Sequence, residues 1–287
     1  MSFEITTAMV QQYNENVVLL QQQKPSRLRA AVREERVQGE YGFFDQIDQT
    51  AAQKRTQRHA DTPLISTPHV RRKVALAPYD WADLIDNFDR PTLITDPTSK
   101  YAVNAVAAMN RSIDDEIIAA ALATAYGGRD GTTTYAFPTS THQIAHGSES
   151  LTIAKLLSAK EILDSYENDP DEPRFLALSA KQVTALLSTT QITSADYNTV
   201  KALAAGQIDT FLGFKFIRTE RLKKVSTTRS CLAWSQNSIL LGIGTDIITR
   251  VSERDDKNYA TQVYVGMFIG ATRMDEKGVV EIQATES

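Results

Sequence analysis

Residues 96–128 read DPTSKYAVNAVAAMNRSIDDEIIAAALATAYGG, and this stretch decides the fold of the chain. Asp96 can cap the free N–H groups of a first helical turn, and Pro97 suits the first helical position. Apolar residues then recur at helical spacing, at Val106, Met109, Ile113, Ile117, Ala121 and Ala125. Gly127-Gly128 follows and ends the helix, because glycine accepts a positive φ without steric cost. The sequence therefore predicts a spine helix over about residues 97–126, roughly 45 Å long at 1.5 Å per residue.

The segment before this helix begins with an arm. Residues 9–20 place Met9, Tyr13, Val17 and Leu20 on one helical face, and Pro25 ends that helix. An arginine-rich piece over residues 26–36 follows, with Leu28 and Val32 as its apolar anchors. A piece this polar buries too little area to fold alone, so we expect residues 1–37 to form an arm that lies on another surface.

Residues 38–78 predict a long hairpin. Two strand-like runs, 40–44 and 70–78, flank a polar interval over residues 45–67. A loop of that length without structure is usually functional, so a hairpin that projects from the body fits better than an internal connection. Residues 54–73 hold six Lys or Arg and one Asp, whereas residues 77–96 hold five Asp and one Arg. These blocks are either solvated surface or complementary patches that meet between chains. The candidate inter-subunit contacts are Phe43, Phe44, Lys54, Arg55, Arg58, Arg71, Arg72, Asp83, Asp86, Leu28 and Val32.

The remainder of the chain alternates helices and strands. Over residues 147–230 the pattern predicts helices at 151–166, 179–187 and 196–205, and strands at 175–178 and 211–218. The last stretch is strand-rich, with strands expected at 231–234, 239–242, 247–251, 259–269 and 278–282. The fold class is therefore α+β.

Composition excludes several classes of protein. The chain has 287 residues, 31 basic against 35 acidic side chains and a formal charge of −4. A protein that coats DNA tightly would carry a positive excess. The single cysteine, Cys231, rules out an intrachain disulfide and suits a reducing compartment. We expect no signal peptide and no membrane span.

No motif assembles an active site. His142 and His146 have the spacing of metal ligands, but Gln143 stands where a zinc protease has glutamate. Gly242 and Gly244 lack the third glycine and the helix of a nucleotide-binding turn, and Cys231 lies in an apolar strand. The acids 114–116 are expected to be a solvated helix face. We therefore expect no catalytic, cofactor-binding or metal-binding residues and no cofactor, and an α+β enzyme of unknown type remains the alternative from another class.

The order of these elements resembles the major capsid proteins of tailed double-stranded DNA phages, with the Hong Kong 97-type fold. The resemblance rests on residues 28–33 (LRAAVR), the capped spine helix, residues 211–218 (FLGFKFIR), residues 239–247 (ILLGIGTDI) and residues 259–271 (YATQVYVGMFIGA). It covers nearly the whole chain. It implies an N-terminal arm at 1–37, an extended loop at 38–78, a peripheral domain at 79–146 and 231–287, and an axial domain at 147–230.

The same resemblance implies function and partners. Such proteins assemble into pentamers and hexamers of an icosahedral head that encloses double-stranded DNA, which the inner face would contact weakly. The implied partners are further copies of this chain, a separate scaffolding protein, a portal protein at one vertex and a decoration or cement protein, with no membrane. The implied location is the virion, after assembly in the host bacterial cytoplasm, and no lysine–asparagine cross-link is expected. An encapsulin-like nanocompartment shell is the alternative with the same fold.

Overall fold

A computed structural model describes residues 22–58, 61–62, 64–85, 98–166, 169, 171–188 and 210–286. The helices predicted at 9–20 and 196–205, the cap formed by Asp96 and Pro97, and Asp86 lie outside these residues. The chain divides into two compact units, which we describe separately. The first comprises residues 1–25, 79–111 and 246–267, and the second comprises residues 26–78, 112–245 and 268–287.

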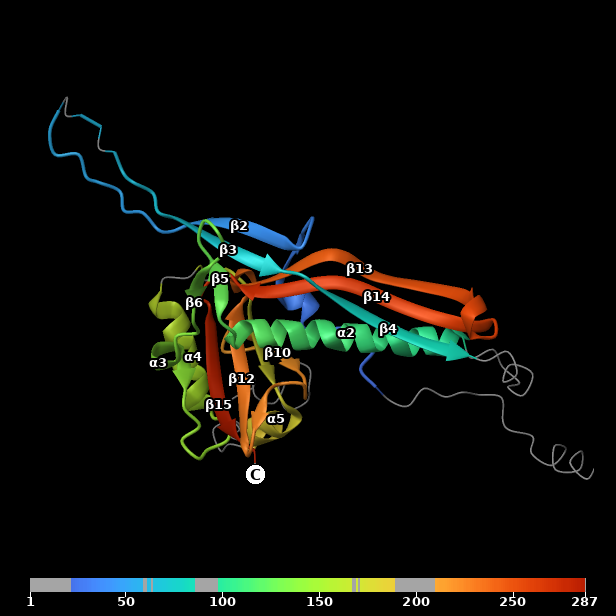
Figure 1. The fold of residues 1–287 in the computed structure, drawn as a ribbon. Coiled ribbons are helices and arrows are strands. Elements are labelled where there is room, and N and C mark those ends of the chain that lie inside the picture. The colour runs from blue at the N-terminus through green and yellow to red at the C-terminus, as the bar shows by residue number, and fades with distance from the viewer. Residues whose placement is uncertain are drawn as a thin grey trace, which may run out of the picture. The chain divides into compact units, whose positions relative to one another are not determined.

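The predicted spine helix is confirmed as α2, Thr98–Leu122 (Figure 1). The predicted apolar face is buried at Met109, Ile113, Ile117 and Ala121. The helix ends at Leu122, however, and not at Tyr126. The next residues form the short strand β5, Ala125–Gly127, so the predicted end of the helix is wrong by about one turn.

The side chain of Arg273 explains this early end. Its Nη1 donates hydrogen bonds to the carbonyl oxygens of Ala121 and Ala123, at 2.9 and 2.8 Å. A cation at these carbonyls satisfies groups that the last helical turn leaves free. The residues that follow the helix then pair with β3 as a strand, in which Gly127 lies opposite Arg72. A side chain at Gly127 would clash with the carbonyl oxygen of Arg71, so the glycine permits a close backbone approach.

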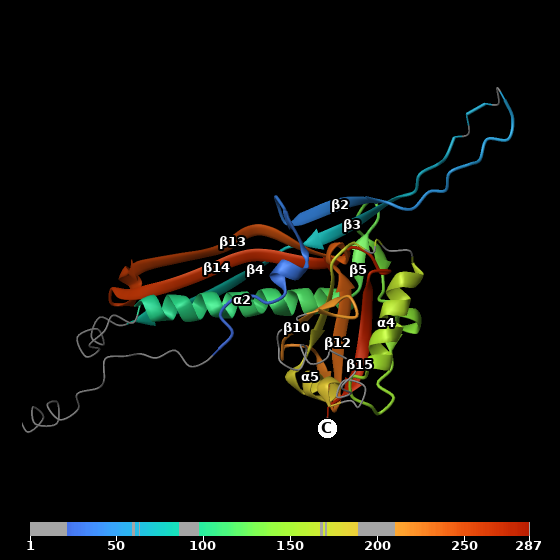
Figure 2. The ribbon, with the colours of Figure 1, turned by 180° about the vertical axis from the view of Figure 1, so that it is seen from behind.

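The second unit contains the predicted hairpin. Strands β2, Tyr41–Ile47, and β3, His69–Ala75, pair antiparallel, and β5 and β6, Thr133–Tyr135, extend them to the order β2-β3-β5-β6. One face of β2 and β3 packs on a core cluster formed by Val37, Val74, Leu76, Leu240 and Met274, with Phe44 and Phe268 against it. Beyond this sheet the loop between β2 and β3 extends away from the other sheets of its unit (Figures 1 and 2). The prediction of a projecting hairpin is confirmed.

The second unit also contains a seven-stranded sheet. Its order is β7-β15-β12-β8-β10-β9, and β11 pairs with β12. These strands are β7, Gln143–Ile144; β8, Arg174–Leu178; β9, Thr210–Phe211; β10, Phe214–Arg218; β11, Lys224–Val225; β12, Thr228–Ser235; and β15, Val279–Thr285. Helices α3, Thr139–His142, α4, Ile153–Ser165, and α5, Ala180–Leu187, belong to the same unit, and α4 packs along β15 (Figure 1). The predicted helices at 151–166 and 179–187 are confirmed, and Ser179 caps α5 as its spacing predicts.

Strand β12 pairs across the expected domain boundary at residue 230. It pairs with β8 of the block 147–230 and with β15 of the last stretch, and the assignment of these strands to a peripheral or an axial domain stays a prediction. Strand partners that lie about 45 to 60 residues apart are not encoded by local pattern, so the sequence could not assign these strands to a sheet.

A third sheet has the order β1-β13-β14-β4, with β1, Arg33–Arg36; β4, Ala77–Ile85; β13, Ile239–Arg254; and β14, Ala260–Arg273. The strands predicted separately at 239–242 and 247–251 form the single strand β13. Short 3₁₀ turns lie at Arg29–Ala31, Gln236–Ser238 and Asp255–Lys257. In the first unit, the Tyr264 hydroxyl bonds to Asp80. Among the described helices, none is long and apolar enough to cross a membrane.

Candidate interaction surface

The outer face of the β2–β3–β5 sheet carries aromatic and cationic side chains together. The strand register places Tyr41, Phe43, Arg71 and Lys73 on the face opposite the core cluster, and Lys73 lies opposite Tyr126 of β5. Tyr41, Phe43 and Tyr126 are 45%, 44% and 50% exposed. We call these five residues the hairpin face. Aromatic and arginine side chains dominate the binding energy of protein interfaces, so this composition is typical of an interface.

The cations of the hairpin face are held over its rings. The Lys73 ammonium lies 3.9 Å from the centroid of the Tyr41 ring, and the Arg71 guanidinium lies 5.7 Å from that of Phe43. Cation–π contacts of this kind are worth about 0.5–1 kcal/mol at exposed sites. They hold the long side chains in place and lower the entropy cost of binding a partner.

An ion pair stands at the edge of this face. Arg71 donates from Nε and Nη2 to the two carboxylate oxygens of Asp45, at 2.5 and 3.1 Å. The hydrogen bond from Arg71 is the main reason that the pKa of Asp45 lies below its usual value. The same bond raises the pKa of Arg71. Both groups are therefore charged at neutral pH and cancel each other.

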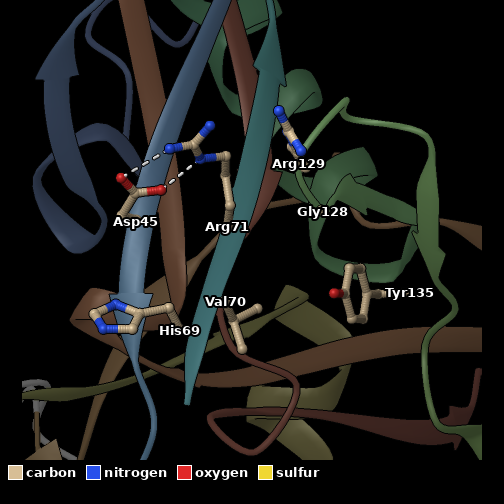
Figure 3. A pocket seen from close by; sticks show the side chains of 7 residues that line it. All are labelled: Asp45, His69, Val70, Arg71, Gly128, Arg129 and Tyr135. Carbon is tan, nitrogen blue, oxygen red and sulfur yellow. Dashed lines mark hydrogen bonds and ion pairs between the residues drawn. The ribbon is translucent and has the colours of Figure 1, made fainter. Parts of the chain in front are cut away.

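A pocket of about 480 Å³ opens beside this pair. It is lined by Asp45, His69, Val70, Arg71, Gly128, Arg129 and Tyr135 (Figure 3). Figure 3 shows Arg129 and Tyr135 on the side of Arg71 away from Asp45. The residues that line the pocket come from three stretches of the second unit: strand β2, strand β3, and residues 128–135, which run from the turn after β5 into β6.

The predicted contact residues separate into two groups. Lys54, Arg55 and Arg58 are exposed in the hairpin loop, Phe43 is exposed, and Phe44 and Arg71 are half-buried. Asp83 is half-buried on β4. Whether these side chains touch another subunit stays a prediction.

Three predicted contact residues are instead buried within their own chain. Leu28 and Val32 are 1% and 3% exposed, in the segment whose backbone N–H groups at Arg27 and Leu28 bond to Asp114. Arg72 is 4% exposed and donates to the Met274 carbonyl and to Glu276. These side chains have almost no free surface, so their assignment as inter-subunit contacts is wrong.

The sequence also missed residues. Tyr126 is assigned to the helix by the periodicity, although it lies on β5, and Tyr135 gives no local signal of its role. Tyr135 stacks on Arg72, with the guanidinium 3.6 Å from the ring centroid. Asp114, expected to be solvated, is fully buried and binds the arm. Only the pairing of β3, β5 and β6 brings Tyr126 and Tyr135 to the hairpin.

The residues considered for catalysis occupy structural positions. His142 is buried and stacks on Tyr166, with ring centroids 5.2 Å apart. Cys231 is fully buried, and burial raises the pKa of its thiol to about 12, which makes it a poor nucleophile. Gly242 lies against the side chains of Val74 and Val37, so it marks a close approach of strands. Within the described residues, no group of three His, Cys, Asp or Glu side chains could hold a metal ion.

Comparison with known proteins identifies the family. The family model for phage capsid protein matches residues 5–286. The chain belongs to the phage capsid protein family. As a major capsid protein it forms the shell of a phage head, and its virion location follows from that role. A search of curated proteins gives no match.

Solved capsid structures share the fold of this capsid protein. The capsid of Ralstonia phage GP4 is 10% identical with a TM-score of 0.76, covering 97% of this chain and 96% of that one. The capsid of cyanophage P-SCSP1u is 14% identical with a TM-score of 0.74, covering 97% and 94%. A structure of Mycobacterium phage Che8 is 13% identical with a TM-score of 0.72, covering 95% and 96%. The Hong Kong 97-type fold expected from the order of the elements is therefore confirmed.

Proposed function

We propose that this capsid protein assembles into pentamers and hexamers of an icosahedral head around double-stranded DNA, and that the hairpin is a principal contact between subunits. The observation that carries this proposal is the exposure of the hairpin. Every described residue over 48–58 and 64–69 is exposed, including Leu64 at 97% and Ile65 at 45%. A hairpin this exposed gains little stability within its own chain and would complete its buried surface on neighbouring copies.

The proposal assigns parts of the chain to roles in the shell. Residues 1–37 are the arm, 38–78 the extended loop, and 79–146 with 231–287 the peripheral domain. The axial domain is the block 147–230, whose strand β8 pairs with β12. The protein acts as a structural subunit without catalytic activity.

The proposed partners act in the assembly pathway. A separate scaffolding protein, a portal protein at one vertex and a decoration protein join the shell, and assembly takes place in the host bacterial cytoplasm. Packaged DNA is contacted weakly, in keeping with the formal charge of −4.

Electron microscopy of the expressed chain, alone and with a scaffolding protein, tests the assembly. Closed shells or five- and six-membered capsomers are expected, whereas a chain that stays monomeric under both conditions contradicts the proposal. Purified shells that exclude nucleic acid and carry no portal vertex would instead identify a nanocompartment.

The hairpin is tested by charge reversal. Arg55→Glu with Arg58→Glu should leave the unassembled chain folded, because both side chains are exposed, and should reduce assembly. Lys215→Glu with Lys181→Glu, on exposed positions outside the hairpin, is the matched control. If the variant of Arg55 and Arg58 forms normal shells, the positive charges of the hairpin loop are not needed for contacts between subunits.

A further inference from the structure

The pocket beside the Asp45–Arg71 pair exists because two paired strands differ in length. β3 has seven residues, His69–Ala75, whereas β5 has three, and their pairing stops where Arg72 meets Gly127. The chain then turns away at Gly128, which has a φ of +80°. Among the described residues, the edge of β3 at His69 and Val70 therefore has no strand beside it on this side. The turn at Gly128 and Arg129, together with Tyr135, forms the opposite side of the pocket. The pocket is therefore a consequence of the sheet topology.

The charges that line this pocket do not cancel. Asp45 and Arg71 neutralise each other through their two hydrogen bonds. Within the part of the chain that the structure describes, Arg129 has no hydrogen bond and no ion pair. Asp130 follows it in sequence but is not among the residues that line the pocket. One full positive charge is left without a counterpart.

The phenol of Tyr135 is a second group in the pocket that can donate a hydrogen bond. The hydroxyl of Tyr135 has no hydrogen bond among the described residues, since Arg72 engages only the ring, and Figure 3 shows this hydroxyl directed toward Val70. His69 also lines the pocket, but Figure 3 shows its ring on the Asp45 side, away from Arg129 and Tyr135. The guanidinium of Arg129 and the phenol of Tyr135 can both donate to an acceptor that carries one negative charge.

A single carboxylate fits this set better than a phosphate chain does. One unpaired guanidinium balances one carboxylate and can bind it with two hydrogen bonds. A nucleic-acid backbone would bring several charges close to Asp45, whose negative charge stands on the pocket wall.

The chain carries an acidic stretch that matches the pocket. Residues 83–89 hold three aspartates and no Lys or Arg. Some of the other acidic side chains have partners within the chain, such as Asp115 with Arg221 and Asp256 with Arg254. Within the described residues Asp83 has no ion pair, and one of its oxygens accepts only the backbone N–H of Leu84.

We propose that the pocket lined by Arg71, Arg129 and Tyr135 binds an aspartate from residues 83–89 of a second copy of this chain. This inference rests on the proposed assembly, and it names one contact within it. The Arg129 guanidinium binds the incoming carboxylate, the Tyr135 hydroxyl donates to it, and the Asp45–Arg71 pair holds the floor of the pocket in place.

The test compares single substitutions in the full-length chain. Arg129→Glu is expected to raise the concentration needed for shell assembly by roughly tenfold or more, since charged hydrogen bonds of this kind are worth factors of about 10 to 100. Arg129→Lys should lie between wild type and Arg129→Glu, because it keeps the charge and loses the paired geometry. Lys215→Glu, which makes the same change of charge at an exposed site on β10, should assemble as wild type does. Equal melting temperatures of the unassembled chains confirm that folding is unaffected.

Restoration identifies the occupant. Asp83→Lys, Asp86→Lys and Asp89→Lys are each combined with Arg129→Glu, and one of them should bring assembly back toward the wild-type concentration. Wild-type assembly by Arg129→Glu overturns the pocket as a contact. Impaired assembly that none of the three lysines restores overturns residues 83–89 as the occupant. If the wild-type chain forms no shells under any condition, the proposed function itself fails, and this contact fails with it.

Discussion

Replacing Glu286 with glutamine should remove much of the stability of the seven-stranded sheet unit. The Glu286 side chain is 1% exposed near the end of the chain. Its two carboxylate oxygens accept hydrogen bonds from Nε and Nη2 of Arg229, each at 3.1 Å. Lys224 lies 3.2 Å away, and the Ser179 hydroxyl that caps α5 donates to the same group. One carboxylate therefore joins the start of α5, strand β11 and strand β12.

The magnitude follows from the pKa of this carboxyl group. Burial alone would raise its pKa, but the bonds from Arg229, Ser179 and Lys224 outweigh burial and lower the pKa from 4.5 to about 2. Each pKa unit corresponds to about 1.4 kcal/mol, so the charged form is stabilised in the folded state by about 3 kcal/mol. Because the folded pKa is the lower one, this stability is fully present above pH 4.5. It is lost as the pH falls from about 4.5 to about 2.

Urea unfolding of the unassembled chain measures this effect, followed by tryptophan fluorescence, to which the buried Trp234 contributes. Glu286→Gln should lower the free energy of unfolding by about 3 kcal/mol at pH 7. The difference from wild type should shrink as the pH is lowered toward 3. Glu253→Gln, at an exposed position of β13, is the matched control and should change stability by less than about 0.5 kcal/mol. A loss below about 1 kcal/mol at pH 7, or a loss that does not depend on pH, would refute the reasoning.

Three further substitutions test other parts of the fold. Arg273→Met leaves the carbonyls at the end of α2 and that of Tyr135 without their donor and should cost about 3–5 kcal/mol in urea unfolding; a loss below about 1 kcal/mol contradicts the capping role. Burial lowers the pKa of His142 below 6.5, so the unfolded state takes up the proton first and stability falls as the pH drops below about 6.5. His142→Phe should flatten that slope between pH 7.5 and 5.5, and an unchanged slope would assign the pH dependence to other groups. Gly127→Ala should cost about 3 kcal/mol or more, because the new side chain meets the Arg71 carbonyl oxygen; a melting temperature equal to that of wild type would show that β3 and β5 can separate freely.

The elements that were predicted correctly share one property: their signal is local. The spine helix, α4 and α5 are set by residues three and four positions apart and by a capping residue such as Ser179. The hairpin is set by two strand-like runs around a polar interval. Adjacent strands joined by one loop pair antiparallel with few alternatives, so β2 and β3 could be assigned to each other without a structure.

The errors arise where a distant residue decides a local outcome. The periodicity of α2 continues to Ala125, but Arg273, about 150 positions further along the chain, binds the carbonyls at Ala121 and Ala123 and the helix ends there. Leu28 and Val32 were predicted to contact a neighbouring subunit because their segment is too polar to fold alone. They are buried because the same chain supplies the surface, through Asp114 and through Trp234, which donates to the Ala31 carbonyl.

For the candidate pocket, the sequence predicted only part of the lining. It marked Arg71 through the charge block of residues 54–73, but it gave no reason to place Arg129 and Tyr135 beside it. Those two residues reach the hairpin because β5 and β6 add to the edge of β3.

Sequence alone determined where most of the described helices and strands of this capsid protein lie and which stretches are rich in charge, since these features depend on neighbours along the chain. Only the tertiary structure decided which charges remain unpaired and which apolar anchors remain exposed. Both outcomes depend on contacts between residues that lie far apart in the sequence, and such contacts leave no helical or strand periodicity from which they could be predicted. The surface that this chain offers to other copies is what remains after those long-range contacts have formed.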